Sequence, residues 1–138
     1  MGKKVDFSRL AQLTAFASIA FIAYATLTRV GFVYSIYYKL APFLMHIGMR
    51  KYAAVEHFVA FAVFGALFSI AYPKRVATIC CVVFGAAIAL ELAQTITPDR
   101  HGTVIDAIQK VSGGAFGILA AKFAIYFWHL KQLAQAKA

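Results

Sequence analysis

The sequence is poor in charged side chains, above all in acidic ones. Only 14% of its 138 residues are charged, with five Asp and Glu against 14 Lys and Arg, whereas 62% are hydrophobic. Soluble domains carry about 25% charged and about 45–50% apolar residues. Because a soluble fold of this size could not bury so much apolar surface, the sequence predicts an all-α integral membrane protein.

The sequence also lacks linkers and the short motifs of familiar enzymes. No Ser-, Pro- or Gly-rich stretch divides it, so residues 1–138 are expected to form a single transmembrane domain. The two cysteines, Cys80 and Cys81, are adjacent in an apolar run, which disfavours a disulfide framework or a metal site. There is no His-Glu-x-x-His, Cys-x-x-Cys, phosphate-binding glycine loop or Gly-x-Ser-x-Gly. We therefore expect no cofactor, no metal and no catalytic residue.

Two chemical alternatives stay open beside that expectation. His57, Glu91 and His101 are metal-ligand types, but their spacing matches no known site. Glu91 and Asp106 could act as an acid/base pair, but nothing in the sequence identifies a nucleophile. An enzymatic activity is not favoured.

The excess of basic residues has two readings, nucleic acid and lipid. The Lys and Arg side chains lie between apolar runs, as juxtamembrane bases do beside anionic lipid. We therefore expect membrane lipids, and not nucleic acid, as partners.

Four apolar stretches approach the roughly 20 residues of a spanning helix. They cover approximately residues 10–28, 53–72, 76–94 and 105–130. The first could be a signal peptide, but it is long for one and has no small-residue cleavage site at its end. It is expected to be retained as a helix.

Residues 30–49 are apolar but contain Lys39 and Pro42, and their large side chains recur at helical spacing. This pattern predicts an interfacial helix between the first and second spans. A fifth span instead would place Lys39 near the bilayer centre, at a cost of about 2.5–3.5 kcal/mol.

The positions of the basic residues predict the orientation. With four spans, the N-terminus, the loop with Lys74 and Arg75, and the C-terminus all lie on one side, taken as the cytoplasmic side of the membrane. The first loop, with Arg29, Arg50 and Lys51, runs against this assignment.

Polar residues gather at the opposite, outer edge of this topology. Ionisable groups at a membrane edge are functional candidates, because burying an unpaired charge costs several kcal/mol. The predicted ligand-binding or structural polar cluster comprises His57, Glu91, Gln94, Arg100, Asp106 and Lys110. Below it, Gly113-x-x-x-Gly117 predicts close helix packing, with Gly65 and Gly85 as similar packing positions.

A purely structural reading of the cluster is equally concrete. Glu91 would pair with Arg100 between helices, and Asp106 with Lys110 within one helix turn. His57 is expected to face inward because it shares a helix face with Gly65, and its neighbour Glu56 is then interfacial.

In these residues the sequence resembles the VanZ-like family of small bacterial membrane proteins. The shared pattern covers about residues 53–122 and reads His57-Phe58 with Gly65, Glu91-x-x-Gln94, Pro98-x-Arg100, Asp106, Gly113 and Gly117. The chain departs from it at Ala53, where the family usually has an acidic residue, and at Lys110, where the family has Asn. The second departure puts in doubt a ligand held through that Asn.

The resemblance implies a protein of the cell envelope with no established enzymatic activity, in a family named for low-level resistance to the glycopeptide teicoplanin. Two functions are favoured over a third, enzymatic one. One is binding or protection of a lipid-linked cell-wall precursor, with Arg100 and Lys110 suited to its phosphate. The other is an accessory subunit of a larger respiratory or photosynthetic membrane complex. The least favoured is a membrane-embedded hydrolase or transferase that depends on Glu91.

Overall fold

A computed structural model describes residues 7–27, 49–96 and 102–136 of the chain. These residues form four α-helices and, among them, no strand: α1 (Phe7–Leu27), α3 (Met49–Ala71), α4 (Val76–Thr95) and α5 (Val104–Gln135). The four helices match the four apolar stretches read from the sequence. The predicted interfacial helix at 30–49 lies outside the described residues except for Met49, which is the first residue of α3.

Three of the helices are long and apolar enough to cross a membrane, namely α3 over Ala54–Ala71, α4 over Val76–Thr95 and α5 over Val104–Gln135. Exposed large side chains outnumber buried ones on these helices; Phe116, for example, is 58% exposed and Leu119 is 68% exposed. In water such a surface would be costly, at about 25 cal/mol per Å² of apolar area. The outward surface of the bundle therefore suits hydrocarbon.

The helix ends follow from local sequence. Pro73 follows α3, as a residue that cannot continue a helix often does. The tight turn is closed by a hydrogen bond from the Arg75 N–H to the Tyr72 carbonyl at 3.0 Å. At the start of α5, Thr103 is the N-cap residue, and its Oγ1 accepts from the Asp106 N–H at 3.1 Å.

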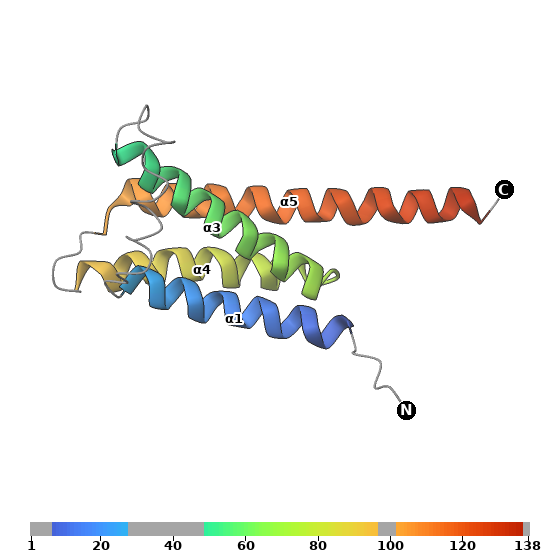
Figure 1. The fold of residues 1–138 in the computed structure, drawn as a ribbon, viewed down its shortest axis with the longest axis horizontal. Helices are drawn as coiled ribbons and strands as arrows, with labels where there is room; N and C mark the ends of the chain where they lie inside the picture. The colour runs from blue at the N-terminus through green and yellow to red at the C-terminus, as the bar shows by residue number, and fades with distance from the viewer. Residues whose placement is uncertain (1–6, 28–48, 97–101, 137–138) are drawn as a thin grey trace, which may run out of the picture.

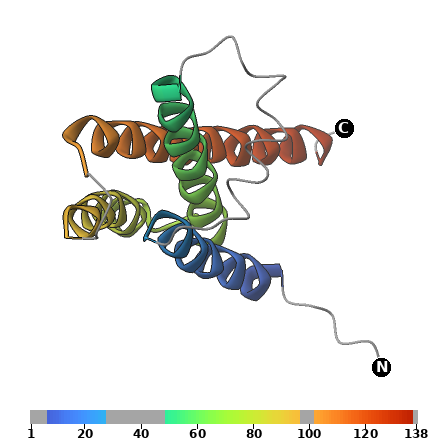
Figure 2. The ribbon, with the colours of Figure 1, turned by 60° about the vertical axis from the view of Figure 1, so that its left-hand side comes forward.

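The dominant packing in the bundle is that of α3 across α5 (Figures 1 and 2). Gly113 lies against the backbone of Phe58, and Gly117 against the backbone of Ala62, so a Cβ on either glycine would come closer than 3.0 Å. Gly65 lies in the same way against the Gly114 carbonyl. These glycines form the α3–α5 seam: Gly65, Gly113, Gly114 and Gly117.

Gly85 does not take part in packing, contrary to the expectation from the sequence. It is exposed on α4, and a Cβ added there would meet nothing within 4 Å. The spacing of small residues indicates where backbones could approach, but the rotation of α4 directs Gly85 away from its neighbours.

Aromatic side chains of α3 fill the interior beside the seam. Phe61, Phe64 and Phe68 are 1–2% exposed. Their rings pack edge to face, with ring centroids 5.7 Å apart for Phe61 and Phe64 and 5.0 Å apart for Phe64 and Phe68. Phe16 of α1 contacts Phe68 at 5.6 Å, and this contact helps hold α1 against the rest of the bundle.

Helix α5 is longer than its neighbours and extends past them. Lys122 marks where the bundle ends, because its Nζ donates to the Pro73 carbonyl in the α3–α4 turn. The rest of α5, residues 123–135, runs about 20 Å beyond that turn at 1.5 Å per residue (Figure 1). This projection bears the exposed side chains of Phe123, Tyr126, Phe127, Trp128, Leu130 and Leu133.

Candidate functional site

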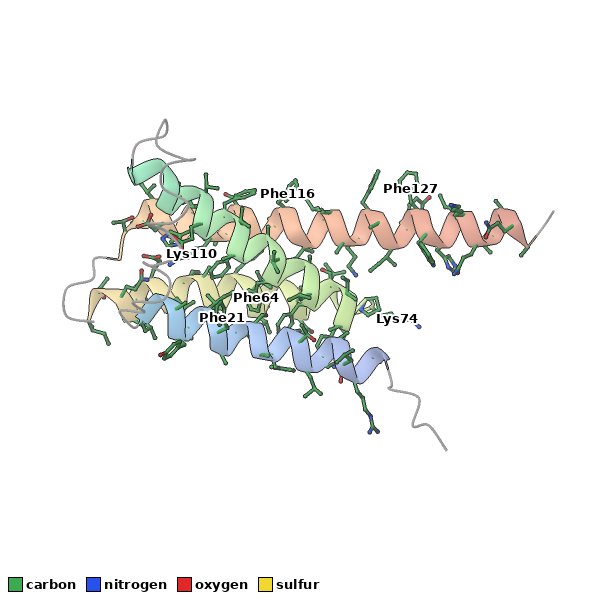
Figure 3. The ribbon with its side chains drawn as sticks, viewed as in Figure 1. Phe21, Phe64, Lys74, Lys110, Phe116 and Phe127 are labelled. Atoms are coloured by element: carbon green, nitrogen blue, oxygen red, sulfur yellow. The ribbon has the colours of Figure 1, made fainter. Side chains whose placement is uncertain are left out.

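The candidate site lies where the last two turns of α4 meet the first two turns of α5, at the end of the bundle away from the α3–α4 turn (Figures 1 and 3). Glu91 and Gln94, one turn apart on α4, are both 6% exposed. Lys110, in the second turn of α5, is completely buried. Because charged side chains are almost never fully buried unless paired, the partner of Lys110 defines this site.

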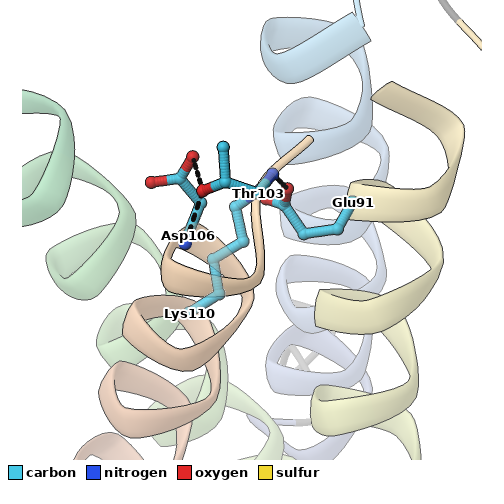
Figure 4. Close-up of polar contacts among 4 residues, drawn as sticks. All are labelled: Glu91, Thr103, Asp106 and Lys110. Atoms are coloured by element: carbon cyan, nitrogen blue, oxygen red, sulfur yellow. Dashed lines mark hydrogen bonds and ion pairs between the residues drawn. The ribbon is translucent and has the colours of Figure 1, made fainter. Parts of the chain in front are cut away.

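That partner is Glu91. The Lys110 Nζ and the Glu91 Oε1 form a buried salt bridge between α5 and α4. The other carboxylate oxygen, Oε2, accepts a hydrogen bond from the Thr103 N–H at 2.9 Å. Both oxygens of Glu91 are therefore bonded to the start of α5 (Figure 4).

Asp106 bonds locally to the cap of its own helix. Its Oδ2 accepts from the Thr103 hydroxyl at 2.7 Å, and its backbone N–H donates back to the same hydroxyl. A carboxylate in the first turn of a helix also interacts favourably with the helix dipole. Glu91, Thr103, Asp106 and Lys110 together make up what we call the Glu91–Lys110 cluster (Figure 4).

The structure corrects the pairing expected from sequence. The expected local pair of Asp106 and Lys110 does not form, because the Lys110 ammonium reaches across to Glu91 and Asp106 bonds to Thr103. The expected pairing of Glu91 with Arg100 falls outside the described residues, as does His101. Lys110 is thus the interhelical partner of Glu91.

Two residues of this site were missed by the sequence reasoning, Gly102 and Thr103. A Cβ on Gly102 would come closer than 3.0 Å to the Glu91 carbonyl oxygen, so only glycine allows this approach. Thr103 could have been recognised from the Thr-x-x-Asp spacing before an apolar run, which resembles a capping box.

Helix α3 brings His57 to the edge of the cluster. His57 is half-buried, whereas its neighbour Glu56 is exposed. The charges of Lys110, Asp106 and Glu91 all act on the His57 ring. The placement follows from the α3–α5 seam, since Phe58 lies directly against Gly113, one turn below Lys110.

One buried polar atom near the cluster has no partner. The Oε1 of Gln109, which precedes Lys110 and lies one turn before Gly113, is buried with no hydrogen bond from any described residue. An unsatisfied buried acceptor costs about 1–3 kcal/mol, so it is uncommon without a reason.

The arrangement presents groups that can bind a polar ligand. Among the described residues, no three His, Cys, Asp or Glu side chains gather closely enough to hold a metal ion. Cys80 and Cys81 are free thiols on α4, in the apolar run where the sequence places them. The cluster offers a fixed ion pair and the half-buried Asp106, with the half-buried His57 at its edge.

The family model that describes VanZ/LLP1 proteins matches residues 3–127, nearly the whole chain. The chain therefore belongs to the VanZ/LLP1 family, as the motifs around the cluster predicted. Together with three helices able to span a bilayer, this membership makes it a membrane protein. No curated protein and no solved structure matches the chain.

Proposed function

We propose that this protein acts at the bacterial cell envelope by binding the headgroup of a lipid-linked cell-wall precursor at the Glu91–Lys110 cluster. The observation that carries the proposal is the fully buried Lys110–Glu91 pair at the end of a membrane bundle, bordered by the half-buried Asp106 and His57. Ionisable groups in such positions are costly and mark functional sites by default.

Stability alone is a poor reason for this ion pair. Replacing a buried salt bridge by apolar residues of similar volume is often neutral or stabilising, because two charges must be removed from water. Gly114 of α5 already lies close against the side chain of Val83 on α4, so these two helices also meet through an apolar contact. The Lys110–Glu91 pair is therefore better explained by a second role, which is to fix polar groups at a lipid-accessible edge.

The free capacity of the site is mainly that of an acceptor. Asp106 is half-buried, and Gln109 Oε1 has no donor among the described residues. Sugar hydroxyls and peptide N–H groups, which a cell-wall precursor carries in number, are the matching donors.

Binding of this kind fits the family association with teicoplanin resistance, because a headgroup held by the protein is less accessible to a glycopeptide. The test is binding of the full chain in nanodiscs to a lipid-linked precursor and to the same polyprenyl phosphate without sugar or peptide. We expect tighter binding of the precursor, and about tenfold weaker binding after Asp106→Asn, which removes a charge-assisted acceptor.

Lys131→Gln is the control for a charge change far from the cluster: it removes one exposed positive charge at the far end of α5, whereas Asp106→Asn removes a negative one. Equal binding of the two lipids, or equal losses in Asp106→Asn and Lys131→Gln, would contradict the proposal.

The projection of α5 favours a second candidate, an accessory subunit of a larger membrane complex. Its aromatic side chains have few described contacts beyond one another, such as Phe123 with Phe127 at 4.4 Å. Trp128 is 68% exposed. Purification in a mild detergent separates the two candidates: a stoichiometric protein partner supports the subunit, and a lone protein supports headgroup binding.

A further inference from the structure

A groove lies at the other end of the bundle, where α1, the end of α3 and the start of α4 meet. Its cavity has a volume of about 190 Å³. It is lined by side chains of all three helices: Phe16, Phe68, Tyr72, Arg75, Thr78 and Val82. It shares no residue with the Glu91–Lys110 cluster.

The groove begins at the polar end of α4 and continues along the apolar part of that helix. Helix α4 has 20 residues and so spans about 30 Å, the thickness of the hydrocarbon core. Arg75 stands at its first end and Val82 about 10 Å further along its axis. A ligand that fills this groove must therefore be polar at one end and apolar along its length.

The polar end of the groove is positively charged. Arg75 and its neighbour Lys74 are both exposed, and no described side chain forms an ion pair with either (Lys74 is labelled in Figure 3). The Arg75 side chain does not cap α4, so the first N–H groups of that helix add to the attraction for an anion. None of the lining residues is acidic.

The apolar part of the groove is built from rings that hold one another. Phe16 meets Phe68 edge to face at 5.6 Å, and Phe68 stacks on Tyr72 at 6.1 Å. Because these rings contact one another, the apolar wall of the groove forms without a ligand. Tyr72 is half-buried and lines the groove together with Arg75.

We propose that this groove binds one anionic phospholipid, with an acyl chain along Phe16, Phe68 and Val82 and the phosphate at Arg75. The charge of the polar end selects an anionic headgroup over a zwitterionic one, as basic pockets between membrane helices do. This site differs from the headgroup site of the proposed function in its place, its ligand class and its residues.

The experiment is native mass spectrometry of the full chain released from detergent, after addition of phosphatidylglycerol or phosphatidylcholine with identical acyl chains. We expect one retained phosphatidylglycerol per protein and little phosphatidylcholine. Arg75→Gln should weaken retention of phosphatidylglycerol about fivefold, the value of one basic side chain near anionic lipid. Thr78→Phe should do the same by filling the groove from its exposed rim.

Lys131→Gln is the matched control, because it removes the same charge far from the groove. Val82→Phe fills the groove at its apolar end and replaces Thr78→Phe if circular dichroism shows that the first variant is unfolded. Equal losses in Arg75→Gln and Lys131→Gln would show only diffuse attraction and overturn the proposal. Unchanged retention in the folded groove-filling variant would overturn it too, because the lipid would then lie elsewhere.

Discussion

At the scale of single residues, the buried salt bridge between Glu91 and Lys110 joins α4 to α5. Glu91 and Lys110 belong to the predicted cluster because ionisable groups at a membrane edge are conspicuous in an apolar sequence. Their pairing depends on the rotation of α4 relative to α5 and on the reach of the lysine side chain, and neither is encoded in local spacing. Because the two residues are 19 positions apart, no spacing rule within one helix relates them.

The first prediction concerns the salt bridge itself. Glu91→Gln strands the Lys110 ammonium in a buried site, and Lys110→Met strands the Glu91 carboxylate. Each single change should lower the free energy of unfolding by about 3–5 kcal/mol. The double variant should lose much less than the sum, because it leaves no uncompensated charge.

The measurement is a double-mutant cycle of unfolding in mixed micelles, with helicity as the signal. If the double variant lost as much stability as the two single variants together, the charges would not interact, and the pairing would be contradicted.

A second prediction concerns the cap of α5. Thr103→Ala removes the hydroxyl that bonds to Asp106 twice, and should cost about 1 kcal/mol of unfolding free energy. Thr14→Ala is the control, because the Thr14 hydroxyl only donates to the Leu10 carbonyl within α1 and caps no helix end. Thr103→Ser should keep the stability of the natural protein, whereas an equal effect of the two alanine changes would speak against a capping role.

At the scale of helices, the apolar runs predicted all four elements because spanning length and low charge leave few alternatives. The boundaries were less accurate. Helix α5 continues to Gln135, five residues past the expected end, since the sequence there contains good helix formers and no breaker. The glycine spacing located Gly113 and Gly117, but it did not identify Gly114 or the register against Phe58 and Ala62.

The third prediction uses that register. Gly117→Ala adds a methyl group where the Ala62 backbone lies too close to admit one, and should cost about 1–3 kcal/mol of stability in detergent. Gly85→Ala adds the same methyl group to an exposed helix position with nothing within 4 Å, and should leave the stability unchanged or raise it by up to about 1 kcal/mol.

Gly117→Ala should therefore lower the midpoint of thermal unfolding, whereas Gly85→Ala should leave it unchanged or raise it. A loss in Gly85→Ala as large as that in Gly117→Ala would show that glycine is needed for a reason other than helix approach.

At the scale of the whole molecule, composition predicted a membrane protein, and the family match with three span-length helices supports that class. The structure adds the separation of two chemically different ends. The Glu91–Lys110 cluster lies at one, and Lys74, Arg75 and Lys122 lie at the other (Figure 3). Helix α4 keeps the two sets apart, because Arg75 at its start and Glu91 near its end are separated by about 24 Å along its axis.

The last prediction is the orientation of this bundle in the membrane. We expect four spans, with α1 as the first, because α1 is a 21-residue helix packed beside α3 and α4. The end with Lys74 and Arg75 should face the cytoplasm, since basic residues in short loops set orientation. Reporter fusions before α1, after Arg75 and after Gln135 should then give a cytoplasmic signal, and a fusion between α4 and α5 an external one. An external signal after Arg75 would invert the bundle and place the Glu91–Lys110 cluster on the cytoplasmic side, where a headgroup displayed outside the cell could not reach it.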